Sequence, residues 1–343
     1  DEHHVTKQTY TDADGQVVER TDVKYASAIY TYDEEGNRLS EFYLNRDDRP
    51  TYSNENFAGW RKEFVQINES WYETRISFYD RNGMLLTRPQ KYAVRETAYD
   101  ENAFVIQTDY YNEKEEPVNI TDGYARAAYE RDDRGNATKI SYYDNEGAAI
   151  MLPGGYASAA YVFDDKNLVT EEYYFDAEEN PAVLSMGQSG VKREYNDASK
   201  VTRLTYVDSA GAPVATTRLY SIEAYTYDAS GNRLTVRYYD TNGAPILCDG
   251  GYAGVNNRYD EKNRLTRVDY LGTADEPILC TGGYASYENS YDENGRLIQV
   301  SHYDTAGNLV MNTSGYAILK RTYNEAGQPE DTYYDTDQNK IDR

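Results

Sequence analysis

The sequence predicts an all-β protein, an elongated tandem-repeat array of stacked β-hairpins. Three observations lead to this expectation: side chains recur every 32 residues, turn motifs punctuate the chain, and the segments between the turns alternate in polarity. A β-solenoid, in which each repeat forms one coil, is the alternative geometry. No segment has the sustained periodicity of an amphipathic helix.

The repeat is clearest in a Tyr-Ala pair that usually follows glycine. Its tyrosines lie 32 residues apart, or three times that interval: Tyr92, Tyr124, Tyr156, Tyr252, Tyr284 and Tyr316. Gln188 and Tyr220 occupy the two intervening positions. A second column holds Tyr110, Tyr142, Tyr174, Tyr206, Tyr238 and Tyr270. We therefore expect residues 1–343 to be one continuous array of about ten 32-residue repeats, with an irregular repeat at 57–80 and both ends truncated within a repeat.

Each repeat carries the turn signal Asp-x-x-Gly, as in Asp33 to Gly36. Aspartate first and glycine fourth fit a type I turn closed by a left-handed residue, a common hairpin loop. Asn167 and Asn263 replace the glycine where a left-handed conformation is still needed. Because no single repeat can bury its own apolar face, neighbours must stack, and we expect equivalent side chains 32 positions apart to touch.

Composition limits the partners of the chain. The 59 acidic and 35 basic residues give a net charge of −24, which repels nucleic acid. No apolar run approaches the ~20 residues that span a bilayer, so no membrane insertion is expected. The aromatic share of 14%, mostly from 38 tyrosines, is too high for a disordered chain. Cys248 and Cys280 share one column and are interpreted as small buried hydrophobic residues.

The irregular repeat contains both tryptophans of the chain and a three-residue insertion. Irregular repeats are common places for ligand contacts, although a tolerated insertion is the alternative. The candidate ligand contacts, which depart from the column pattern, are Trp60, Arg61, Trp71 and Tyr72.

Two further hypotheses concern the columns themselves. Stacked turns would bring carboxylates together for calcium, at Asp228, Asp260 and Asp292. The alternative is that each carboxylate accepts N–H groups of its own turn, with no metal bound. Tyrosine columns could likewise bind glycans, or could simply pack across strands.

The segments Tyr32–Leu39 and Tyr227–Leu234 both read Tyr-Asp-x-x-Gly-Asn-Arg-Leu. They resemble the YD repeats of Rhs-type bacterial proteins, over about a third of each repeat. The resemblance implies a secreted or surface protein whose hairpins wind into long sheets, which in some members enclose a toxic cargo.

Motifs for catalysis are missing from the sequence: there is no Gly-x-Ser-x-Gly, no metal-ligand cluster and no phosphate loop. We therefore expect no enzyme activity and no cofactor. The function that we expect is a non-catalytic structural or binding region of a secreted or cell-surface bacterial protein, an extended scaffold or platform for a glycan or protein ligand. One alternative is a cell-wall or polysaccharide-binding module of a larger enzyme, and another is a fragment of a toxin-encapsulating shell.

Overall fold

The computed structural model describes residues 4–342, which form β-strands and turns and contain no helix. Among these residues, accordingly, no helix is long and apolar enough to cross a membrane. Residues 1–3 and 343 of the predicted array lie outside the described part of the chain. The prediction of an all-β array of successive hairpins is confirmed.

Contacts divide the chain into two compact units. The first runs to Phe163 and also includes Tyr174–Ala182, and the second comprises Asp164–Tyr173 and the chain from Val183 onward. The strands of the first unit are β1 (Lys7–Thr9), β2 (Ser27–Tyr32), β3 (Arg38–Leu44), β4 (Gly59–Ile67), β5 (Ser70–Tyr79), β6 (Val94–Tyr99), β7 (Val105–Tyr111), β8 (Arg126–Arg131), β9 (Ala137–Tyr143) and β10 (Ser158–Phe163). Both units contribute residues to β11 (Val169–Phe175).

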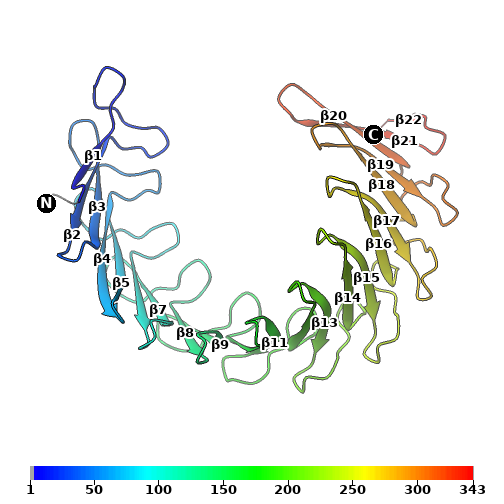
Figure 1. The fold of residues 1–343 in the computed structure, drawn as a ribbon, viewed down its shortest axis with the longest axis horizontal. Helices are drawn as coiled ribbons and strands as arrows, with labels where there is room; N and C mark the ends of the chain where they lie inside the picture. The colour runs from blue at the N-terminus through cyan, green and yellow to red at the C-terminus, as the bar shows by residue number, and fades with distance from the viewer. Residues whose placement is uncertain (1–3, 343) are drawn as a thin grey trace. The chain divides into compact units, whose positions relative to one another are not determined.

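The second compact unit continues the same pattern. Its strands are β12 (Gly190–Tyr195), β13 (Val201–Val207), β14 (Ile222–Tyr227), β15 (Arg233–Tyr239), β16 (Gly254–Tyr259), β17 (Leu265–Leu271), β18 (Ser286–Tyr291), β19 (Leu297–Tyr303), β20 (Ile318–Tyr323), β21 (Pro329–Tyr334) and β22 (Lys340–Ile341). Within each unit the strands follow one another in chain order and pair antiparallel with their neighbours (Figure 1). Antiparallel hairpins, not coils of a solenoid, therefore build the sheet.

The hairpin loops have the geometry that the turn motif predicts. Gly36 and Gly231 have φ angles of 90° and 83°, and Asn167 and Asn263 have 61° and 59°. At the first position, the Asp228 carboxylate accepts the Asn232 N–H at 2.8 Å. Glycine and asparagine are favoured there because other residues are strained at positive φ, although Ala103 and Ser199 hold the position at 66° and 59°.

Between hairpins the chain forms a longer arm, which returns from one strand to the next. In one arm the Ile246 N–H donates to the Tyr238 carbonyl at 3.1 Å, and the Cys248 N–H to the Tyr252 carbonyl at 2.8 Å. Neighbouring arms are joined by a hydrogen bond between positions 31 residues apart, as from the Thr281 N–H to the Gly250 carbonyl at 2.8 Å. Stacking between adjacent repeats is therefore carried by the arms as well as by the sheet.

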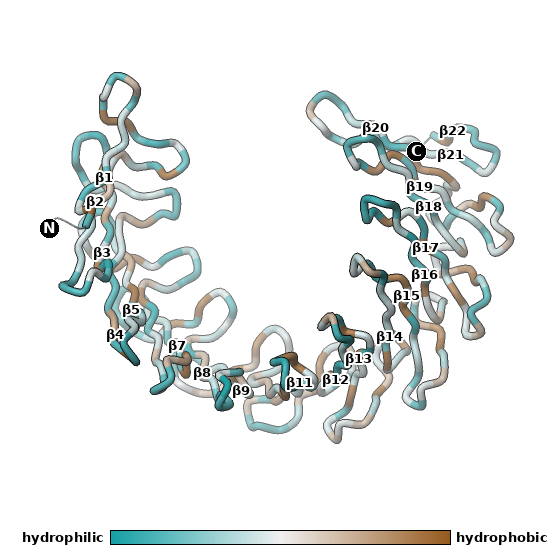
Figure 2. Tube along the Cα trace, in the orientation of Figure 1, coloured by the Kyte–Doolittle hydropathy of each residue, from teal (hydrophilic) through white to brown (hydrophobic). Residues whose placement is uncertain are grey.

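The aromatic core is a ladder in which the two tyrosine columns alternate. The Tyr238 ring lies 4.5 Å from the Tyr220 ring and 5.9 Å from the Tyr252 ring, measured between centroids. Tyr270, which is 32 positions from Tyr238, packs edge to face against Tyr252 at 4.7 Å instead. The expectation that equivalent side chains touch is therefore wrong for this column. Each antiparallel return places an arm tyrosine between two hairpin tyrosines. Along the chain the hydrophobic residues occur in short stretches (Figure 2).

Small side chains are buried where two backbones approach. Ala93, Ser221 and Ala317 are each 0% exposed, and the Ala93 N–H donates to the Tyr111 carbonyl at 2.7 Å. Cys248 and Cys280 are also buried and free, in keeping with their interpretation as small core residues.

Leu219 is out of place in its column. It has a φ of 75° and is 54% exposed, whereas Gly187, Gly251 and Gly283 hold the equivalent position at positive φ. A side chain with a Cβ costs ~1–2 kcal/mol at positive φ, and glycine avoids this strain. Glycine also gives the unfolded chain more entropy, which offsets part of the gain. Leu219→Gly should therefore stabilise the protein by about 0.5–1 kcal/mol. Urea denaturation measures this. Leu219→Ala keeps the Cβ and should give no such gain, and equal stability of the two variants would contradict the strain argument.

Candidate ligand-binding surface

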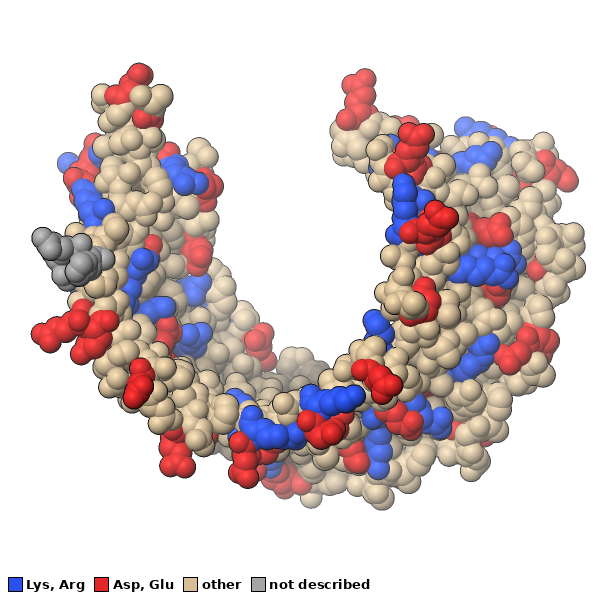
Figure 3. All heavy atoms as spheres, in the orientation of Figure 1, with Lys and Arg blue, Asp and Glu red and all other residues tan. Residues whose placement is uncertain are grey.

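Alternation along each strand gives the sheet two chemically different faces. One face, the ladder face, carries the alternating aromatic rings, as at Tyr238. The other, the charged face, carries arginines and carboxylates, as at Arg237 beside it in sequence. On the surface that Figure 3 displays, basic and acidic side chains are interspersed and leave no large area of a single sign.

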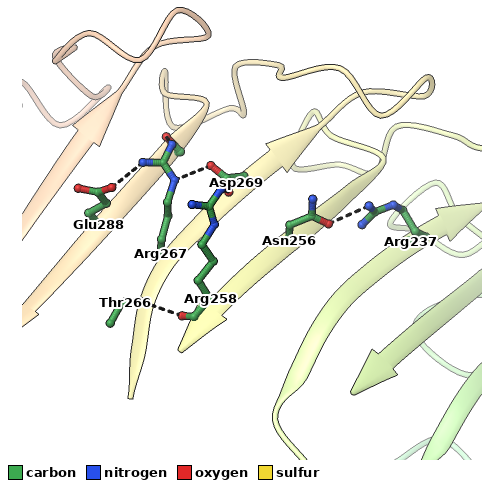
Figure 4. A network of polar contacts seen from close by, with 8 residues as sticks. Arg237, Asn256, Arg258, Thr266, Arg267, Asp269 and Glu288 are labelled. Atoms are coloured by element: carbon green, nitrogen blue, oxygen red, sulfur yellow. Dashed lines mark hydrogen bonds and ion pairs between the residues drawn. The ribbon is translucent and has the colours of Figure 1, made fainter. Parts of the chain in front are cut away.

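Arginines of the charged face are paired with neighbouring strands. Arg267 on β17 donates to Asp269 at 2.7 Å, to Glu288 on β18 at 2.6 Å and to the Ser286 hydroxyl at 2.9 Å (Figure 4). Arg237 on β15 donates to Asn256 at 2.8 Å. The carboxylates of Asp269 and Glu288 neutralise Arg267, and Asp275, 2.8 Å from the Arg237 Nε, neutralises Arg237. The face therefore offers little free charge there.

The same arrangement recurs in the first compact unit. Arg75 on β5 occupies the column of Arg267 and binds Glu96 on β6, with Glu115 at 3.2 Å. Glu96 lies in the column of Glu288. Position 96 or 288 therefore supplies the carboxylate that neutralises the arginine of the preceding strand.

Arg61 lies in the same column as Glu96 and Glu288 but carries the opposite charge. It pairs across β4 and β5 with Ser77, as Glu96 pairs with Asp109 one repeat later. Among residues 4–342 no carboxylate lies within ion-pair distance of the Arg61 guanidinium. The structure thus leaves this exposed cation without a protein anion.

Aromatic rings hold the Arg61 side chain in place. Its guanidinium carbon lies 5.6 Å from the Phe42 ring centroid and 5.2 Å from that of Tyr79. The two rings meet at 5.7 Å across Gly59. A Cβ on Gly59 would lie 2.3 Å from the Phe42 ring and 2.6 Å from the Glu41 carbonyl oxygen. Glycine is therefore what allows the Phe42 ring to lie over the backbone.

An open hollow of about 640 Å³ surrounds the Arg61 guanidinium. Two hydroxyls in it, of Thr31 and Ser40, are 2.6 Å apart. Its lining comprises Thr31, Leu39, Ser40, Arg61, Lys62, Glu63, Arg75, Ser77, Tyr79 and Glu115. A preoriented cation, aromatic faces and hydroxyls can hold a polar or anionic group without covalent chemistry.

The other predicted ligand contacts do not join Arg61. Trp60 points to the ladder face, where it packs against the core and lies 4.8 Å from the Lys62 ammonium. The insertion lengthens β4 and β5 to 9 and 10 residues, and Trp71 lies 36% exposed near their tip. The Tyr72 ring lies 5.4 Å from the Tyr99 ring. The four side chains are therefore distributed over one long hairpin.

The proposed calcium ligands are each engaged within their own turns. Asp228 accepts the Asn232 amide at 2.9 Å, while Asp260 and Asp292 accept the Nε of the arginine four positions later, both at 2.7 Å. Hydrogen bonding to these groups lowers the pKa of all three carboxyls. Among the described residues no group of three His, Cys, Asp or Glu side chains is arranged to hold a metal. Calcium binding stays a prediction.

The aromatic partners of Arg61 were not predicted from the sequence. Phe42 and Tyr79 belong to β3 and β5, and only the pairing of these strands with β4 brings their rings over Gly59. The available signal was the position of Arg61 in the irregular repeat at 57–80.

No protein-family model matches the chain, and no curated protein is a significant match. Similar solved structures include TcdB2-TccC3-Cdc42, at 15% identity and a TM-score of 0.31 over 89% of this chain, and the Photorhabdus luminescens Tc holotoxin pore, at 12% and 0.31 over 90%. This chain spans 15% of each of those chains. A porin-like protein from Bacteroides uniformis is 10% identical, with a TM-score of 0.23, over 89% of this chain and 86% of that one.

Proposed function

We propose that the array is a non-catalytic binding scaffold of a secreted or cell-surface protein, and that it holds its ligand on the charged face at Arg61. The supporting observation is the unpaired Arg61 guanidinium, fixed between Phe42 and Tyr79 in the hollow of about 640 Å³. The chain leaves other arginines of this face paired, as Arg75 and Arg267 are. A protein carboxylate or an anionic glycan group would complete the site.

Arg61→Ala should weaken ligand retention by about tenfold or more, because a charged hydrogen bond contributes about 1.5–3 kcal/mol. The measurement is retention of cell-surface extracts and arrayed glycans by the immobilised chain. Arg203→Ala, on the charged face of the second compact unit, is the matched control. Equal retention by wild type and Arg61→Ala would overturn the assignment to this hollow.

Trp60→Ala separates binding from folding in the same hairpin. Because Trp60 packs against the core on the other face, its loss should lower the free energy of unfolding while leaving retention by folded protein unchanged. Denaturant titration and the retention assay together measure the two effects. Loss of binding in stably folded Trp60→Ala would place the ligand on the ladder face instead.

A further inference from the structure

A second hollow, on the ladder face of the first compact unit, is basic although the chain as a whole is acidic. Its volume is about 410 Å³, and its lining comprises Arg95, Thr97, Tyr99, Val105, Thr108, Tyr110, Tyr129 and Arg131. Two arginines and no carboxylate line it, in a chain with a net charge of −24. We call it the basic hollow. By contrast, Glu63 and Glu115 line the hollow around Arg61.

Arg131 departs from the column to which it belongs. In most other repeats, although not at Phe163, the position holds a tyrosine whose hydroxyl donates to the carbonyl 26 residues earlier, as from Tyr99 to Glu73 at 2.9 Å and from Tyr227 to Val201 at 2.6 Å. The Arg131 Nε makes the equivalent bond, to the Val105 carbonyl at 2.5 Å. The structural role of the column is therefore kept, and a positive charge is added to it.

The remaining donors of Arg131 are only partly used by the protein. Its Nη1 donates to the Gly135 carbonyl at 2.7 Å, and its Nη2 has no partner among residues 4–342. The guanidinium carbon lies 5.4 Å from the Tyr129 ring centroid. The Tyr129 hydroxyl likewise makes no hydrogen bond within the described chain. These donors are available to a ligand.

Arg95 is the second departure, because the following repeats carry Ala127, Ala159 and Val191 in its column. It lies opposite Tyr110 across β6 and β7. Its Nη2 binds Glu73 at 2.7 Å, and its Nε is buried without a hydrogen-bond partner. A buried donor left unpaired costs about 1–3 kcal/mol, which a bound acceptor would recover.

The local carboxylate does not balance these charges. Glu73 binds Arg95 through one oxygen at 2.7 Å and the Lys62 ammonium through the other at 2.7 Å. Arg95 thus shares its one acid with Lys62, and Arg131 has no ion-pair partner among the described residues. The surplus positive charge attracts an anion and orients it through planar guanidinium donors.

We propose that the basic hollow binds the carboxylate or sulfate group of an acidic glycan. Tyr99, Tyr110 and Tyr129 offer flat apolar rings to the C–H faces of sugars, and Thr97 and Thr108 offer hydroxyls to sugar oxygens. The volume of about 410 Å³ lies within the range of small-molecule sites. This site is separate from the hollow at Arg61 and does not rest on the function proposed for it.

The test measures binding of the full chain to hyaluronan oligosaccharides, dextran sulfate and neutral dextran by titration calorimetry. Arg131→Tyr restores the column residue and its hydrogen bond to Val105, so it should fold normally and weaken acidic-glycan binding by about tenfold or more. Arg95→Ala, with the side chain found at Ala127, should do the same. Arg258→Ala, at a 67% exposed arginine of the second compact unit, is the matched control and should bind as wild type does.

Binding of hyaluronan identifies a carboxylate ligand, and binding of dextran sulfate alone identifies a sulfate ligand. Binding of either polymer supports the proposal if Arg131→Tyr weakens that binding. Failure of both polymers to bind, equal binding of neutral dextran, or unchanged affinity in Arg131→Tyr would overturn it. The part of the binding that Arg131→Tyr removes should be unchanged in Arg61→Ala, so failure here is distinguishable from failure of the function proposed at Arg61.

Discussion

Replacing Tyr220 by alanine should lower the free energy of unfolding by about 3–5 kcal/mol, as expected for removal of a large buried ring. Tyr220 is 1% exposed and lies 4.5 Å from the Tyr238 ring and 6.0 Å from the Tyr206 ring. Its hydroxyl donates to Glu223 at 3.1 Å. The substitution removes both ring contacts and leaves a cavity inside the ladder. Urea denaturation followed by circular dichroism measures the loss.

Tyr220→Phe is the control for that substitution. It keeps the ring and removes one hydrogen bond, so it should cost only about 1 kcal/mol. In this variant the Glu223 carboxylate still accepts hydrogen bonds from the hydroxyls of Tyr206 and Tyr225, at 3.0 and 2.6 Å. If the phenylalanine variant lost as much stability as the alanine variant, the hydrogen bond rather than ring packing would dominate.

Alkaline pH should unfold the array as its phenols ionise. Burial raises the pKa of Tyr111 and of Tyr142 to about 12. It also raises the pKa of Tyr220 and Tyr238. An unfolded phenol titrates near 10, so above about pH 10 the unfolded chain releases protons that the folded chain still holds. The contribution of these buried phenols to the free energy of unfolding is complete below pH 10 and is lost as the pH rises through 12.

Phenolate absorbance and circular dichroism, recorded together against pH, test this expectation. The ladder phenols should ionise above pH 10, in the same range in which the β-sheet signal disappears, with a transition that is steeper than a single independent titration. Simple titration of all tyrosines near pH 10, with the sheet signal unchanged, would show that the ladder is not buried in solution.

The hairpins could be predicted from the sequence because their signals are local. Aspartate at the first turn position and glycine or asparagine at the left-handed position determine the loop without long-range information, as at Asp228 and Asn263. The alternation of the ladder could not be predicted in this way. Equal spacing within each column places Tyr238 and Tyr270 in equivalent environments, but it does not show that Tyr252 lies between them.

The candidate sites also combine features that the sequence predicts with features that depend on strand pairing. Arg61 belongs to the irregular repeat, which made it a candidate in the sequence, whereas its ring partners come from other strands and depend on register. Arg95 and Arg131 also differ from the residues found in their columns, but they lie in different repeats. Only the positions of β6 and β8 in the sheet bring them to one hollow. Residues that differ from the rest of their column can therefore be recognised in the sequence. Which of them lie together in space depends on how the strands pair.

Double-mutant cycles on the ladder test its alternating order most directly. The pair Tyr220 and Tyr238, 18 positions apart and in ring contact at 4.5 Å, should show a coupling energy of about 0.5–1.5 kcal/mol. The pair Tyr238 and Tyr270, 32 positions apart with Tyr252 between them, should couple by no more than a few tenths of a kcal/mol. A coupling between Tyr238 and Tyr270 as large as that between Tyr220 and Tyr238 would mean that equivalent side chains touch and that the columns do not alternate.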